Sequence, residues 1–172
     1  DIHLCQKSLE LTKKKALMIK INVIINNIKW LLYIKNPNIY LDRKLKKLNF
    51  KNKDFKKNNI FCTLLLSNNK EIKLLNKKFR KKNKATDVLS FPFQTKYELK
   101  KKLKKEEEIY IGDIIINLSK VKNKKVLNNF KYEFDRLWIH GLVHLLGYTH
   151  KKDKDFLKMS HIEKRYFNFI NV

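Results

Sequence analysis

Three histidines near the C-terminal end of the chain have the spacing of a metal site. His140, His144 and His150 all occur in the segment HGLVHLLGYTH. On a helix, residues i and i+4 lie on one face, so His140 and His144 can turn imidazole nitrogens toward the same cation. Gly147 allows the helix to end there, because glycine tolerates left-handed backbone angles, and the returning chain can bring His150 to that cation. The pattern predicts a metal site with three nitrogen ligands.

The chemistry of three imidazole ligands favours a catalytic ion. Three protein ligands leave one tetrahedral position open to water, whereas structural zinc sites usually fill all four positions. Zinc suits this ligand set best, and we expect one Zn²⁺ ion per chain, although nickel, copper and iron also accept nitrogen ligands. The alternative is that these are ordinary helical histidines, since a single i, i+4 pair arises by chance. A fourth histidine nearby, His161, is interpreted as a surface residue of the last helix.

The same spacing occurs in metzincin proteases, H-E-x-x-H-x-x-G-x-x-H, where the glutamate acts as the base. This chain has Gly141 at that position, which counts strongly against a protease. A metal-bound hydroxide would then need a base from elsewhere in the protein. The other solution is a substrate that carries its own nucleophile, as the 2′-hydroxyl of RNA does.

The net charge indicates a polyanionic partner. The chain has 41 Lys and Arg residues against 16 Asp and Glu, which gives a formal charge of +25. Such a positive field raises affinity for RNA and accelerates encounter with it. The basic residues are nearly all lysine, with only four arginines, and this bias together with abundant Asn and Ile is typical of drift toward A/T-rich codons. A solvated lysine surface without a partner is therefore the other interpretation.

The length of 172 residues suits one domain with a core of its own. Cys5 and Cys62 are too few for a disulfide framework, which favours a reducing compartment. The longest apolar stretch, residues 19–34, is interrupted by Lys and Asn, so we expect no membrane segment and a cytoplasmic protein. We also expect residues 18–172 to form the functional domain, with residues 1–17 as an N-terminal extension or an artefact of the assigned start site.

Hydrophobic periodicity predicts an α+β fold in which a mixed sheet of about four strands packs with helices and the histidine helix lies near the C-terminus. The strand order cannot be read from the sequence. The predicted strands are residues 19–25, 60–66, 88–93 and 109–117. The predicted helices are residues 39–50, a segment from the caps at 67–69 to 79, and residues 118–127, 133–146 and 155–169, with a loop containing some helix at 96–108.

Three segments together resemble the YbeY family of bacterial rRNA maturation factors. These are ATDVLSFPF at residues 85–93, IGDIII at residues 111–116 and HGLVHLLGYTH at residues 140–150, and they follow one another in the same order as in that family. The resemblance runs from about Met18 to the C-terminus. It implies a single-strand-specific, zinc-dependent endoribonuclease in 16S rRNA 3′-end maturation and ribosome quality control. It also implies rRNA and the small ribosomal subunit as partners, with ribosomal proteins or an assembly GTPase as further ones.

The resemblance also implies a catalytic arginine before the second segment, and Arg80 stands at that position. A planar, bidentate guanidinium can grip a phosphodiester, although an arginine at a solvated helix end is the alternative. Asp113 follows Gly112 and is a candidate to hydrogen-bond a ligand imidazole; it could equally fix the strand edge or be a plain turn carboxylate. Thr149 replaces the usual aspartate of the family, which removes a charge near the metal and predicts a modestly lower metal affinity.

A second hypothesis belongs to a different functional class. The chain could be a ribosome-assembly factor in which the zinc has a structural role and nuclease activity is weak or absent. The missing base at Gly141 keeps this hypothesis open.

Overall fold

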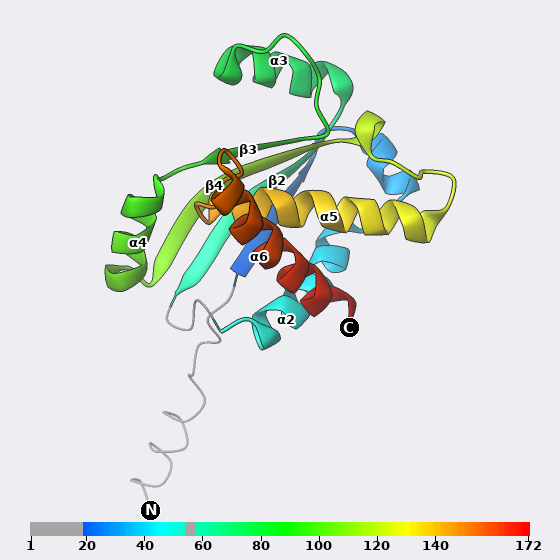
Figure 1. The fold of residues 1–172 in the computed structure, drawn as a ribbon. Coiled ribbons are helices and arrows are strands. Elements are labelled where there is room, and N and C mark those ends of the chain that lie inside the picture. The colour runs from blue at the N-terminus through cyan, green and yellow to red at the C-terminus, as the bar shows by residue number, and fades with distance from the viewer. Residues whose placement is uncertain (1–18, 54–57) are drawn as a thin grey trace, which may run out of the picture.

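The apolar runs of the sequence form a four-stranded sheet (Figure 1). The structure is a computed structural model that describes residues 19–53 and 58–172. The strands are β1 (Ile19–Ile25), β2 (Asn59–Ser67), β3 (Val88–Pro92) and β4 (Glu108–Asn117). Their order is β1-β2-β4-β3, with β1, β2 and β4 parallel and β3 antiparallel to β4 at one edge. The four predicted strands are confirmed to within one residue at each end.

The described residues also form five α-helices and two 3₁₀ turns. In Figure 1, α3 lies on one side of the sheet, and α5 and α6 lie on the other. The α+β fold predicted from the sequence is therefore confirmed. The elements are η1 (Ile28–Leu32), α2 (Pro37–Lys51), α3 (Asn69–Arg80), α4 (Lys96–Lys105), η2 (Leu118–Lys120), α5 (Leu127–Leu145) and α6 (Asp153–Asn171).

One predicted helix, residues 118–127, is wrong. The chain forms only the short turn η2 there, and α5 begins at Leu127. The side chain of Asn117 accepts a hydrogen bond from the backbone N–H of Ser119, which supports a tight turn after β4. Asn123 then adopts a left-handed φ of 58°, which an α-helix does not contain. The apolar spacing of this segment thus reflects a connection that packs on the core.

Residues 96–108, predicted as a loop with some helix, are mostly the helix α4. A capping box starts this helix, since Thr95 accepts from the backbone N–H of Glu98, whose carboxylate accepts from the backbone N–H of Thr95. Two orphan donors of the first turn are thereby satisfied, which lets a lysine-rich segment form a helix. The predicted extension, residues 1–17, and Cys5 within it lie outside the described residues.

The helix α5 is anchored to the sheet by an apolar stripe at four-residue intervals. Phe130, Phe134, Trp138 and Leu142 are all fully buried. Residues at this spacing share one face of a helix, so the stripe fixes how α5 is rotated against the sheet. The neighbouring stripe, which carries the histidines, is consequently held at the margin of the core.

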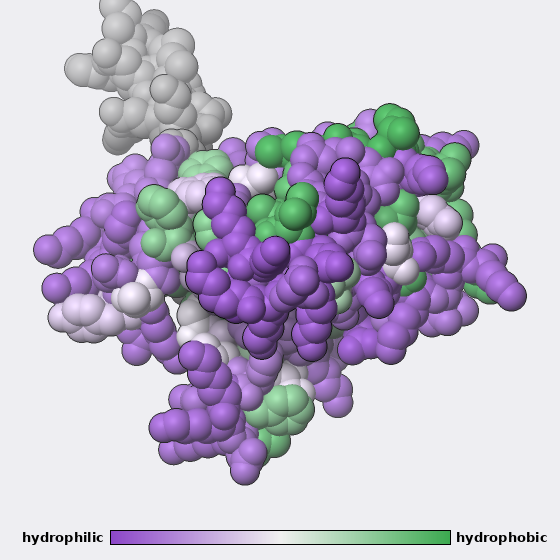
Figure 2. All heavy atoms as spheres, turned by 90° about the horizontal axis from the view of Figure 1, so that it is seen from above, coloured by the Kyte–Doolittle hydropathy of each residue, from purple (hydrophilic) through white to green (hydrophobic). Residues whose placement is uncertain are grey.

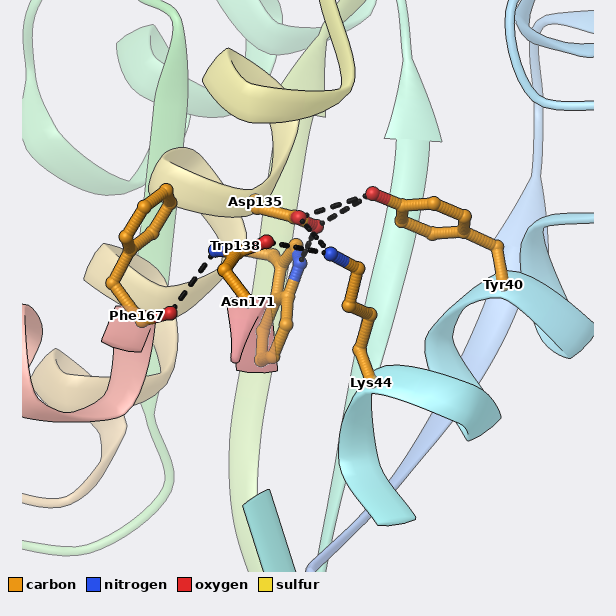
Figure 3. Close-up of polar contacts among 6 residues, drawn as sticks. All are labelled: Tyr40, Lys44, Asp135, Trp138, Phe167 and Asn171. Carbon is orange, nitrogen blue, oxygen red and sulfur yellow. Dashed lines mark hydrogen bonds and ion pairs between the residues drawn. The ribbon is translucent and has the colours of Figure 1, made fainter. Parts of the chain in front are cut away.

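A buried carboxylate ties α2, α5 and α6 together (Figure 3). Asp135 of α5 is 1% exposed. Its carboxylate accepts hydrogen bonds from the Tyr40 hydroxyl at 3.0 Å and from Trp138 Nε1 at 2.9 Å, and it pairs with Lys44 Nζ at 2.9 Å. Lys44 also donates to the side chain of Asn171 in α6 at 2.8 Å. Burial raises the pKa of Asp135, and the charge of Lys44 opposes that rise.

The surface on the α3 side is mostly hydrophilic, with separate hydrophobic patches (Figure 2). Within the described ranges, none of the helices combines the length and the apolar character that a membrane span requires.

We expect Lys44→Met to lower the free energy of unfolding by about 3 kcal/mol at neutral pH, because removing one partner leaves a buried charge uncompensated. A raised native-state pKa means that the native state binds the proton at higher pH than the unfolded chain does. Stability therefore rises as pH falls through that pKa, and the deficit of the variant should shrink in mild acid. Urea unfolding of both proteins at neutral pH and in mild acid measures the loss of stability and its dependence on pH.

The matched control is Lys47→Met on the same helix, because Lys47 is exposed. This substitution should change stability by no more than about 0.5 kcal/mol. A Lys44→Met deficit that stays constant with pH would contradict the assignment of the buried charge to Asp135.

Candidate metal centre

The histidine stripe of α5 lies beside a close contact between this helix and the sheet. Gly141 follows His140 and faces β4, and a Cβ atom at position 141 would lie only 2.6 Å from Cγ2 of Ile114. A side chain at this position would therefore point into the core and away from the histidines. This placement explains why no base follows the first histidine, and it supports the sequence argument against a protease.

The two helical histidines turn the same nitrogen toward each other. The Nε2 atoms of His140 and His144 lie 3.1 Å apart. Two nitrogens bound to one tetrahedral zinc at about 2.0–2.1 Å would be separated by roughly 3.3 Å. The geometry of the pair is therefore that of two ligands of one ion.

The Nδ1 atoms of both rings are occupied by other partners. His140 Nδ1 lies 2.6 Å from Oε1 of Glu163, and His144 Nδ1 lies 3.0 Å from the carbonyl oxygen of Tyr148. Both partners can only accept, so each Nδ1 carries the proton and donates it. In the neutral rings each Nε2 then bears a bare lone pair. Two facing lone pairs repel each other, and a cation between them removes that repulsion.

His144 is held neutral and ready to bind a cation. Burial, and then the neighbouring His140, lower the pKa of His144 to about 4. Metal ligation requires the unprotonated imidazole, so no proton has to be displaced from this ring at neutral pH. The donor set thus fits a metal ion by its chemistry as well as by its geometry.

The third histidine is brought back by a glycine turn at the end of α5. Gly147 has a φ of 87°; its N–H donates to the carbonyl of His144 at 2.9 Å, and the N–H of Tyr148 donates to the carbonyl of Val143 at 3.3 Å. These two bonds form a Schellman motif, in which glycine relieves the strain of the left-handed position. The ring of His150 then lies 5.0 Å from that of His144, centroid to centroid.

One ligand atom from each of His140, His144 and His150 lies within 4.8 Å of the others, so the three are positioned for metal binding. Among the described residues, His140, His144 and His150 form the one cluster of three or more His, Cys, Asp or Glu side chains that is close enough to hold an ion. His161 is exposed on α6 and is not part of it.

Glu163 is a site residue that the sequence did not single out. It lies in α6, and its hydrogen bond to His140 fixes both the tautomer and the orientation of that ring. Residue 163 is 23 positions from residue 140, so no local spacing links the two. Only the packing of α6 against α5 brings them together.

Asp113 lies on the opposite face of the sheet from the histidines. Its neighbour Ile114 faces α5, and alternate residues of a strand point to opposite faces. The carboxylate of Asp113 accepts a hydrogen bond from the Tyr110 hydroxyl, which also contacts Thr63 at 3.1 Å. The structure therefore does not bring Asp113 to a ligand imidazole, and the role considered for it belongs to Glu163.

Arg80 lies at the free edge of the sheet. It is the last residue of α3, and it donates to the carbonyl of Ser90 in β3 at 3.0 Å, with its guanidinium 5.8 Å from the ring centroid of Phe91. The strand β3 is at the end of the sheet order, so Arg80 borders an unpaired strand edge. Its side chain is exposed and engages the backbone through one nitrogen.

A cavity of about 440 Å³ opens beside His140. It lies between α5, α6, the start of β3 and the segment after η2. The metal centre is thus at the side of a hollow large enough for part of a ligand.

Comparison with known proteins decides the family. The family described as Endoribonuclease YbeY matches residues 35–171. The chain belongs to the YbeY family. The YbeY endoribonuclease of Pelagibacter ubique is 45% identical over 158 residues, covering 90% of this chain and 98% of the relative. That of Ehrlichia canis is 32% identical over 162 residues, covering 90% and 94%.

A solved structure supports the same fold. The solution structure of TM1509 from Thermotoga maritima aligns with a TM-score of 0.54 and 27% identity, over 88% of this chain and 89% of that protein. The resemblance seen in the three sequence segments is confirmed, and the YbeY match covers the metal centre and Arg80 alike.

We predict that Gly141→Ala destabilises the protein by about 1–3 kcal/mol, because the added methyl group overpacks the contact with Ile114. At an exposed helical position the same change would stabilise by about 1 kcal/mol. Asn128→Ala, at an exposed position of α5, is the control and should not destabilise. Equal urea midpoints for wild type and Gly141→Ala would show that α5 is not held against β4 at this point.

The two candidate carboxylates can be separated by metal affinity. Glu163→Gln should weaken binding of Zn²⁺ by about 10–100-fold, because the neutral amide no longer holds the His140 ring as a carboxylate does. Asp113→Asn should leave the affinity unchanged, since it lies across the sheet. Competition with a chromophoric chelator measures both, and the opposite ranking would contradict the assignment.

Proposed function

We propose that this protein is a zinc-dependent endoribonuclease that cleaves single-stranded RNA, with one Zn²⁺ held by His140, His144 and His150. The observation that carries the proposal is the pair of Nε2 atoms 3.1 Å apart whose Nδ1 protons are both engaged elsewhere. The curated relatives that are named endoribonucleases support the reaction class. Zinc is the ion that three neutral imidazoles suit best.

A zinc ion held by the three histidines would supply a Lewis acid and would make water more acidic. The protein's own residues set the conditions for that chemistry. Glu163 and the carbonyl of Tyr148 hold the two ring tautomers, so both Nε2 lone pairs stay directed to one point. The turn at Gly147 keeps the third imidazole close while leaving His150 exposed.

Arg80 is proposed as the catalytic residue that binds the scissile phosphodiester. A guanidinium has five N–H donors, and the described contact to Ser90 uses one nitrogen. The remaining donors can hold two phosphate oxygens and stabilise the charge that develops during cleavage. The attacking group is either water or the substrate 2′-hydroxyl, and the chemistry of the product ends distinguishes them.

The substrate is proposed to be 16S rRNA at its 3′ end, cut during maturation and quality control of the small ribosomal subunit in the cytoplasm. The charge of +25 supports binding to an RNA backbone. Ribosomal proteins or an assembly GTPase are proposed as additional partners. The functional domain is proposed to span residues 18–172, with residues 1–17 as an extension.

The test combines metal content with cleavage of structured rRNA fragments. We expect elemental analysis to find one zinc per chain in wild type and in Arg80→Ala, and we expect cleavage by the variant to fall by at least about 100-fold. Arg80→Lys should recover only part of the activity, because lysine lacks the bidentate fork. Arg43→Ala, at an exposed position of α2, is the control and should cleave normally.

Zinc without cleavage by the wild type would contradict the nuclease proposal and favour an assembly factor with a structural metal. Absence of any bound metal would overturn the site itself.

A further inference from the structure

The cavity beside His140 is lined largely by side chains that have no role in the proposed reaction. It continues from His140 along α5, away from the other two histidines. Basic, acidic and aromatic side chains line it. The basic and aromatic ones include Lys120, Lys122, Tyr132, Arg136, Lys164 and Phe167. The acidic ones are Asp87, Glu133 and Glu163, of which Glu133 pairs with Arg136 and Glu163 is bonded to His140.

The basic residues of this cavity are available to a ligand. Lys120, Lys122 and Lys164 are exposed, and none of them forms an ion pair within the part of the chain that the structure describes. Arg136 pairs with Glu133 at 3.4 Å, but its side chain is 59% exposed. Exposed ion pairs of this kind are weak and exchange readily for a phosphate. The cavity therefore offers several cationic contacts to an anionic chain.

Tyr132 adds an aromatic surface to the same cavity. It is 53% exposed, and its ring meets that of Phe167 in an edge-to-face contact, with centroids 4.8 Å apart at 72°. The contact holds the tyrosine ring in place from α6. A fixed, half-exposed ring next to cations is the combination on which single-stranded nucleic acids stack their bases.

The spacing along α5 relates this ring to the metal centre. Tyr132, Arg136, His140 and His144 follow one another at four-residue intervals, so they lie along one side of the helix. At about 1.5 Å of rise per residue, Tyr132 lies about 12 Å from His140 along the axis. A base stacked on Tyr132 thus belongs to a nucleotide near the scissile phosphate and not to the one being cut.

We propose that this cavity is a subsite for an unpaired nucleotide of the RNA substrate, with the base stacked on Tyr132 and the adjacent phosphates bound by Lys122, Arg136 and Lys164. The inference rests on the proposed function, because it takes the substrate to be RNA. A base must leave its duplex to stack on a side chain, so the subsite selects single-stranded RNA next to the cleavage position.

The test measures binding apart from cleavage. The probe is a fluorescein-labelled, fully 2′-O-methylated single-stranded oligonucleotide, and its anisotropy is followed with the full-length, metal-loaded protein. In a series of probes each nucleotide in turn is made abasic. For wild type we expect one position at which loss of the base weakens binding by about tenfold, which is the range of one base–aromatic stack.

Variants of Tyr132 then connect that position to the cavity. Tyr132→Ala should bind the intact probe about tenfold more weakly and should no longer distinguish the abasic probe. Tyr132→Phe should retain wild-type affinity, because the stacking surface is kept. Phe50→Ala removes an aromatic residue that is 84% exposed on α2, away from the cavity, and should leave binding unchanged.

Equal affinity of wild type and Tyr132→Ala, or an abasic series without a sensitive position, would overturn the subsite. So would equal binding of the corresponding duplex. Failure of the proposed function appears differently, as a wild-type protein that binds the methylated probe with this pattern but never cleaves unmodified RNA.

Discussion

The close approach of α5 to β4 at Gly141 is the constraint on which the rest of the site depends. A residue without a side chain allows the helix to pack directly on Ile114, and the buried stripe that includes Trp138 and Leu142 fixes its rotation. The next stripe of the helix is then held at the margin of the core, where His140 and His144 are partly exposed. The same contact that stabilises the fold thus orients the two helical imidazoles, so packing and chemistry are set by one interface.

A network of polar contacts also holds α6 in position relative to α5. The buried carboxylate of Asp135 is bound by Tyr40 and Lys44 from α2, and Lys44 reaches on to Asn171 at the end of α6. This polar network lies at the far end of α6 from its start near the histidines. It therefore supports from a distance the position of Glu163, whose hydrogen bond orients His140.

The sequence predicts those features that depend on local spacing. The three histidines and Gly147 lie within eleven residues, and the four strands are short apolar runs, so both could be found from the pattern alone. Glu163 could not, because it reaches His140 only through helix packing. The face of the sheet on which Asp113 lies could not be predicted, for another reason. Helices cover parts of both faces of the sheet, so IGDIII is apolar on both sides of the strand. The alternation of polar and apolar residues that reveals a strand's orientation is therefore lost. Residues 118–127 were wrongly predicted as a helix because the apolar residues of this connection mimic helical spacing.

The compactness of the ligand set in the sequence has a consequence for how the protein acquires its ion. All three histidines come from one segment of eleven residues, so bringing them together costs little chain entropy even before the domain is complete. A cation that also binds the unfolded segment adds less to the stability of the folded state than its affinity suggests. Metal binding and folding are then less tightly coupled than at a site whose ligands come from distant segments. The eleven-residue segment can meet a cation before α6 is synthesised, and the hydrogen bond between His140 and Glu163 forms only once α6 packs against α5.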